Sequence, residues 1–137
     1  MDIEVKVKLI LAAQSWSKKC PVFLMVEGGG MLGLPTMHLY MGTTPIEVVS
    51  SMLKETIGVG YNEADGGSNW LFPTIDGASI DKTTGDLVLT YNCIIPESND
   101  PPKGFVWKTI ADIMTESDAI FPYDLSILHK YAVGEKV

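Results

Sequence analysis

The sequence predicts a domain of the α+β or α/β class. Apolar and polar residues alternate from Ile3 to Leu9, which is the pattern of a half-buried strand. A capped helix with one apolar face follows between Thr44 and Gly58, and the segment Leu87–Ile95 is a second strongly apolar strand. Periodicity identifies these elements but does not give the order of the strands in the sheet.

The first third of the chain is expected to form a β-hairpin. Its first strand runs from Ile3 to Ala13 and becomes fully apolar from Leu9 onward. The polar segment Ser15–Lys19 reads as a turn, and Pro21–Val26 is the second strand. Gly28-Gly29-Gly30 lacks the Lys-Ser/Thr pair of a phosphate-binding loop, so we interpret it as a tight turn.

The central helix has signals at both ends. Thr44 and Glu47 have the spacing of a capping box, and Pro45 falls at the first helical position, where its missing N–H costs nothing. Gly58 suits the left-handed residue that follows a last helical turn. Apolar residues recur between them at spacings of three and four, at Ile46, Val49, Leu53 and Ile57.

The second half of the chain contains turn signals, strands and two more helices. Turns are expected at Asp76-Gly77 and Gly85-Asp86, and a loop over Pro96–Gly104. A strand at 105–107 leads into a short helix at 109–114, and the last helix begins at Asp118 or Pro122 and ends at Gly134.

Composition limits the classes of function. The 137 residues, 46% of them hydrophobic, are expected to form one domain, 1–137. A net charge of −7 argues against binding the phosphate backbone of nucleic acid or an anionic membrane, but not against a small nucleotide. Cys20 and Cys93 lack the spacing of a zinc site or a disulfide framework. The acidic first residues do not resemble a signal segment, so a cytoplasmic location is expected.

One stretch carries a family resemblance. Residues 34–59, LPTMHLYMGTTPIEVVSSMLKETIGV, comprise an extended segment, a turn and a capped helix that ends in Gly58-Val59. This stretch resembles the Nudix box, G-x5-E-x7-R-E-U-x-E-E-x-G-U, where U is aliphatic. The frame residues that match are Leu34, Pro35, His38, Gly42, Thr44, Pro45, Glu47, Leu53, Lys54, Glu55, Gly58 and Val59. The resemblance implies a Nudix-like α/β/α sandwich with a mixed β-sheet.

The catalytic part of the box is largely replaced. The first Gly of the family falls on Met37 and the first Glu on Thr43, while the Arg-Glu pair falls on Ser51-Met52. The Glu-Glu pair falls on Glu55-Thr56, so Glu55 alone remains of the carboxylates that hold Mg²⁺ in the family.

The resemblance therefore gives a poor metal site. Spacings of three and four place Ser51 and Met52 beside Glu55 on the helix. A thioether offers nothing to Mg²⁺, which prefers oxygen ligands. If a cation binds, Glu55 is the candidate metal ligand and catalytic group, with Glu47 about two turns earlier as a second catalytic candidate.

Three residues are candidates for contacting a ligand: Trp70, His38 and Glu97. Trp70 stands beside a Gly-containing loop and could stack on a base, although packing in the core or its rim is the alternative. His38 has no Ser or Cys partner at a diagnostic spacing, and a structural histidine is its alternative. Glu97 lies in a loop where acids are mostly solvated.

Three functions remain open. The chain could be a non-hydrolytic Nudix-like protein that binds a nucleotide-like ligand or a protein partner, because function depends on the site and not on the fold. It could be a divergent metal-dependent pyrophosphohydrolase that acts on a nucleoside diphosphate derivative. It could also be an acidic interaction protein, and an exposed patch of Met37, Met41 and Met52 would favour this third function.

Overall fold

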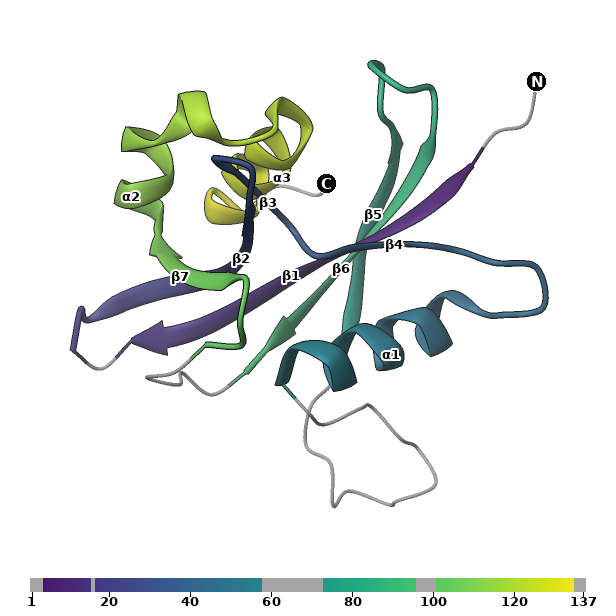
Figure 1. Cartoon of the computed structure of the whole chain (residues 1–137), viewed down its shortest axis with the longest axis horizontal. Coiled ribbons are helices and arrows are strands. Elements are labelled where there is room, and N and C mark those ends of the chain that lie inside the picture. The colour runs from purple at the N-terminus through teal and green to yellow at the C-terminus, as the bar shows by residue number, and fades with distance from the viewer. Residues whose placement is uncertain (1–3, 16, 58–72, 96–100, 135–137) are drawn as a thin grey trace.

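The computed structural model describes residues 4–15, 17–57, 73–95 and 101–134, which form one seven-stranded mixed sheet with helices on both faces (Figure 1). The strands are β1 (Val5–Ser15), β2 (Cys20–Gly28), β3 (Met31–Gly33), β4 (Thr36–His38), β5 (Thr74–Ile80), β6 (Leu87–Ile94) and β7 (Phe105–Thr109). The helices are α1 (Pro45–Ile57), α2 (Ile110–Thr115) and α3 (Pro122–Ala132), with a 3₁₀ turn at Ser117–Ala119.

The long strand β1 is the centre of the sheet. It pairs antiparallel with β2 over its second half, where Ser15 lies opposite Cys20, and antiparallel with β4 over its first half. Its other edge pairs with β6 in parallel, from Val5 opposite Leu87 to Ala12 opposite Ile94. The order β3-β2-β1-β6-β5, with β4 beside β1 and β7 beside β2, confirms the predicted mixed sheet.

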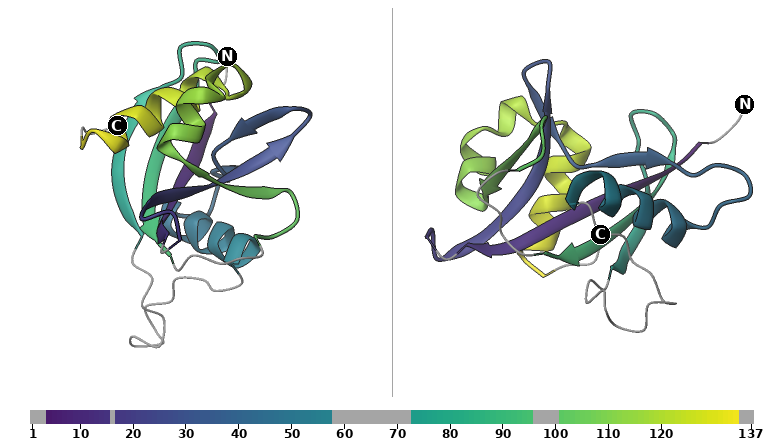
Figure 2. Two further views of the ribbon diagram at one scale, coloured as in Figure 1. Left: turned by 90° about the vertical axis from the view of Figure 1, so that its left-hand side faces the viewer. Right: turned by 60° about the horizontal axis from the view of Figure 1, so that its bottom comes forward.

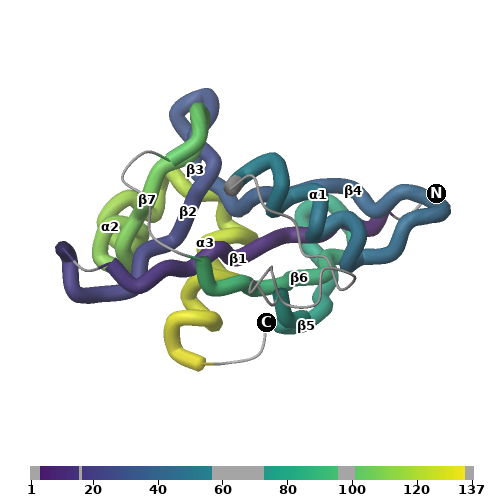
Figure 3. The backbone as a smooth tube through the Cα atoms, turned by 90° about the horizontal axis from the view of Figure 1, so that it is seen from below, coloured from purple at the N-terminus to yellow at the C-terminus, as the bar shows by residue number. Residues whose placement is uncertain are grey.

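The face toward α1 is packed by the odd-numbered residues of β1, because successive side chains of a strand point to opposite faces. Val7 and Leu9 are fully buried there against Val49 and Leu53 of α1. The helix packs against β1 and β4 (Figure 3). This face is therefore a closed apolar layer wherever α1 covers it.

The opposite face is packed by the even-numbered residues of β1. Ile10 contacts a second core in which Ile113 of α2 and Ile127 and Leu128 of α3 are buried. Figure 2 shows α1 on one side of the sheet and α2 and α3 on the other. The α/β/α sandwich is therefore confirmed.

Most predicted elements form, and one turn is wrong. The turn at Gly29-Gly30 joins β2 to β3 with φ values of 61° and 79°, which glycine adopts without steric cost. Asp76-Gly77, by contrast, lies inside β5, where the register against β6 shifts between Ile75 and Gly77. The strand absorbs an extra residue as a bulge there, so the chain does not reverse. Within the described ranges no helix has the length and apolar character needed to cross a membrane.

Candidate functional site

The N-terminus of α1 is closed by its own capping box. The backbone N–H of Glu47 donates to the Thr44 hydroxyl at 3.3 Å, and both the N–H and the hydroxyl of Thr44 donate to Oε1 of Glu47 at 3.3 and 3.0 Å. The carboxylate of Glu47 thus satisfies a helix end that would otherwise expose unpaired N–H groups. Its assignment to catalysis stays a prediction.

Two positions that hold carboxylates in the Nudix box are buried in this chain. Met52 is 2% exposed and belongs to the core between α1 and the sheet. Thr56 is 4% exposed, and its hydroxyl donates to the carbonyl oxygens of Met52 and Leu53 of its own helix at 2.7 and 3.3 Å. The expectation that Met52 flanks Glu55 at the surface is therefore wrong: α1 turns position 52 inward with Val48 and Val49.

Glu55 is exposed on α1. The separation of eight residues from Glu47 corresponds to about 12 Å along the helix axis, so these two carboxylates cannot share one cation. Among the residues that the structure describes, no group of three His, Cys, Asp or Glu side chains is arranged to hold a metal ion. A single exposed carboxylate above a buried thioether does not fit Mg²⁺, which takes several oxygen ligands.

His38 ends β4 at the surface. Its Nδ1 lies 3.3 Å from Oε2 of Glu4, and both side chains are about half exposed, at 48% and 59%. Its ring centroid is 6.5 Å from that of Tyr40. His38 and Glu4 thus form an exposed pair at the start of the loop before α1. Contact of His38 with a ligand stays a prediction.

The methionine patch predicted for an interaction surface does not form as expected. Met41 is fully exposed, but Met37 packs against the α1 core and Met52 is inside it. Trp107 of β7 packs against this same cluster. Trp70 and Glu97 lie outside the described residues, and their ligand contacts stay predictions.

Sequence reasoning missed a buried ionic cluster on the opposite face. Nζ of Lys8 lies 2.8 Å from Oδ1 of Asp124, whose side chain is 2% exposed, and donates to the Thr36 hydroxyl at 3.0 Å. The backbone N–H of Leu34 donates to Oδ2 of Asp124 at 2.9 Å. Asp124 therefore ties α3 to the strand segment that leads into α1. The sequence gives only a weak indication of this cluster. Lys8 stands two residues before the buried Ile10, so the alternation of the strand places a lysine on a buried face.

Gly33 allows the segment before β4 to lie close to Asp124 and Phe121. A Cβ atom at this position would lie 3.0 Å from Oδ2 of Asp124 and 3.0 Å from a ring carbon of Phe121. A side chain at position 33 would push α3 away from the segment that Asp124 holds.

Comparison with known proteins identifies the fold. No family model matches the sequence, and no curated protein is significantly similar to it. Among solved structures, the Ap4A hydrolase of C. elegans superposes with a TM-score of 0.70 at 14% identity, covering 96% of this chain and 98% of that one. The fold is Nudix-like.

Two further solved structures have the same fold, one crystallised with a protein and the other with a nucleotide derivative. The C-terminal domain of mouse MUTYH, crystallised with human PCNA, gives a TM-score of 0.75 at 12% identity, covering 97% of this chain and 90% of that one. The NUDIX domain of Shewanella oneidensis NrtR, crystallised with ADP ribose, gives 0.61 at 14% identity, with 84% and 78% covered. At these identities the similarity establishes the Nudix-like architecture alone.

Proposed function

We propose that this chain is a Nudix-fold binding protein that does not carry out metal-dependent hydrolysis. The burial of Met52 and Thr56 in α1 carries this proposal. Hydrolysis by the family route needs a carboxylate cluster that holds Mg²⁺, because the cation polarises the phosphate and generates hydroxide. Here two of those positions stabilise the core instead.

The side chains of Met52 and Thr56 are both fully accommodated inside the protein. Met52 packs with Leu53 in the α1 core, where burying a methionine side chain contributes about 1.5–3 kcal/mol to stability. The Thr56 hydroxyl is satisfied by the carbonyl oxygen of Met52, so it has no need of an outside partner. Neither side chain is oriented toward a surface cation.

A nucleotide-like small molecule is the ligand that we favour. The frame that turns the chain into α1 is kept intact: the Thr44–Glu47 cap, Pro45 at the helix start and Gly42 with a φ of 88° in the preceding turn. A turn and cap with the geometry of the resembling box, beside side chains that cannot hold a metal, fit a protein that uses the fold for binding. NrtR, whose NUDIX domain was crystallised with ADP ribose, is a precedent of the same fold.

A protein partner is the second candidate, and one observation favours it. Tyr40 and Met41, in the loop before α1, are 63% and 103% exposed. Tyr and Met are enriched at protein interfaces, since each presents a large apolar surface. The MUTYH domain that was crystallised with PCNA shares the fold.

The test is a panel of nucleoside diphosphate derivatives, assayed for product release and for melting temperature with and without Mg²⁺. We expect at least one compound to raise the melting temperature without being hydrolysed. A ligand at 100 times its Kd stabilises the folded state by about 2.7 kcal/mol, which corresponds to several degrees for a domain of this size.

Glu55→Gln is the matched control. Product release that needs Mg²⁺ and disappears in this variant would contradict the proposal and support a divergent pyrophosphohydrolase. If no compound shifts the melting temperature, the nucleotide-like ligand is wrong, and a capture experiment comparing wild type with Tyr40→Ser/Met41→Ser tests the protein partner.

A further inference from the structure

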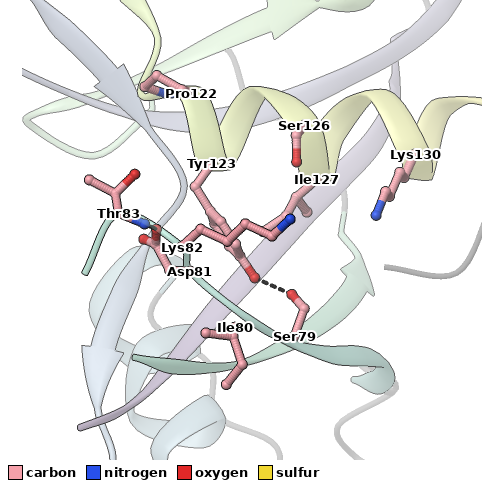
Figure 4. Close-up of a pocket in the computed structure, with 10 residues that line it drawn as sticks. All are labelled: Ser79, Ile80, Asp81, Lys82, Thr83, Pro122, Tyr123, Ser126, Ile127 and Lys130. Atoms are coloured by element: carbon pink, nitrogen blue, oxygen red, sulfur yellow. Dashed lines mark hydrogen bonds between the residues drawn. The ribbon is translucent and has the colours of Figure 1, made fainter. Parts of the chain in front are cut away.

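A hollow of about 420 Å³ lies between the β5–β6 hairpin and α3, on the face of the sheet opposite α1 (Figure 4). This volume falls within the range of about 300–1,000 Å³ that small-molecule sites occupy. Its walls include Ser79, Lys82, Tyr123, Ser126, Ile127 and Lys130. The hollow is thus separate from every residue of the Nudix box.

Two lysines from different elements line this hollow. Lys82 comes from the hairpin and Lys130 from the C-terminal half of α3, and both are exposed. Within the described part of the chain neither has an acidic group at ion-pair distance, whereas Lys6, Lys8 and Lys108 are each paired with a carboxylate. The lining holds these two ammonium groups and one carboxylate, Asp81, so its net charge is positive in a protein of net charge −7.

Hydroxyl groups add neutral donors to the same hollow. The hydroxyls of Ser79 and Tyr123 are hydrogen-bonded to each other, and that of Ser126 is on the next turn of α3 (Figure 4). Burial raises the pKa of the Tyr123 phenol above its ordinary value, so this group remains a neutral donor. Asp81 is an acid in the same wall; its Oδ1 accepts the backbone N–H of Thr83 at 2.9 Å, and its negative charge opposes that of a bound anion.

Apart from Thr83, the remaining walls are apolar. Ile127 is 2% exposed and Ile80 is 51% exposed, and Pro122 lies at the start of α3. A ligand that fits this hollow therefore combines a multiply charged anion with a ring or short aliphatic part. A phosphate has enough oxygen atoms to accept from both ammonium groups and from a hydroxyl at once.

We propose that this hollow binds a small phosphomonoester, whose phosphate contacts Lys82 and Lys130 and whose apolar part lies on Ile80 and Ile127. The site does not depend on the proposed function, because it shares no residue with α1 or with the loop before it. Its affinity is electrostatic in part and falls as salt is added.

The test is a titration of the ¹⁵N-labelled protein with phenyl phosphate, followed by NMR. We expect saturable shifts at the backbone amides of residues 79–83 and 123–130. We expect none of these shifts from benzyl alcohol, which has the ring without the charge. Lys82→Gln/Lys130→Gln should weaken binding by about tenfold or more, because each lysine supplies a charge-assisted hydrogen bond.

Lys18→Gln/Lys54→Gln is the matched control, since it removes two exposed lysines elsewhere with the same change in net charge. Equal weakening in the two double variants, or shifts that do not saturate or that lie away from the hollow, would overturn the site. If inorganic phosphate binds as tightly as phenyl phosphate, the proposed contact between the apolar part of the ligand and Ile80 and Ile127 is wrong.

Discussion

Asp124 joins α3 to the approach to α1 through its buried carboxylate. Its carboxylate accepts from the backbone N–H of Leu34 and pairs with Lys8, and it is almost completely buried. Removing one partner of a buried ion pair leaves the other charge buried without compensation. The resulting loss of folding free energy exceeds what the pair itself contributes to stability.

Asp124→Ala is therefore expected to lower the free energy of unfolding by about 3 kcal/mol or more. Urea unfolding followed by circular dichroism measures this loss. Asp118→Ala is the control, because Asp118 is an exposed acid near the start of the same helix and should change stability by less than about 0.5 kcal/mol. Equal stabilities of the two variants would show that the Asp124 cluster is not an anchor.

The pair of Lys6 and Asp86 gives a pH dependence with a definite sign. Nζ of Lys6 lies 2.8 Å from Oδ2 of Asp86. The hydrogen bond from Lys6 lowers the pKa of Asp86, and the same bond raises the pKa of Lys6. The stabilisation by Asp86 is present above its unfolded pKa and is lost as pH falls through its folded pKa. The stabilisation by Lys6 is lost as pH rises through its own raised pKa.

The stability difference between the wild type and Asp86→Asn should therefore be largest between about pH 5 and pH 10, and shrink on both sides. Unfolding curves across the pH range measure it. A difference that is constant from acid to neutral pH would mean that the ion pair does not form in solution.

Among the elements, α1 shows what sequence can predict. Thr44, Pro45 and Glu47 are local signals, and a local signal is enough to start a helix at the right residue. Asp76-Gly77 shows the limit. Its turn chemistry is also compatible with a bulge, and the pairing of β5 with β6 decides between the two.

Thr44→Ala tests the cap of α1. We expect it to lower the free energy of unfolding by about 1 kcal/mol, because the N–H of Glu47 loses its acceptor. Ser51→Ala, at an exposed position inside the same helix, should leave stability unchanged or slightly higher. A Thr44→Ala variant as stable as Ser51→Ala would show that the cap contributes nothing.

At the scale of the whole molecule, the sequence predicted the α/β/α sandwich through a resemblance, and the neighbouring structures bear out the Nudix-like fold. The parallel pairing of β1 with β6 does not follow from periodicity, which carries no information on which strands are neighbours. The ionic cluster of Lys8 and Asp124 could not be predicted for the same reason: its partners meet only once α3 lies over the sheet.

The site was predicted in part. The sequence shows which residues stand where the resembling Nudix box has carboxylates, but it does not show their environment. Met52 follows Val49 by three residues and Thr56 follows Met52 by four, so helical spacing could have assigned both to the buried face. The structure shows that Met52 and Thr56 belong to the buried face, whereas Ser51 and Glu55 on the same helix are exposed.

The stability of Met52→Glu, compared with Ser51→Glu and measured with and without Mg²⁺, tests most directly whether position 52 belongs to the core and not to a metal site. We expect Met52→Glu to lose about 4 kcal/mol or more, since it buries a carboxylate without a partner, and Mg²⁺ to restore none of it. Ser51→Glu, one residue away on the exposed side, should stay within about 0.5 kcal/mol of the wild type. A Met52→Glu variant that is as stable as Ser51→Glu, and that Mg²⁺ stabilises further in a saturable way, would contradict the assignment of position 52 to the core and restore the case for a metal-dependent hydrolase.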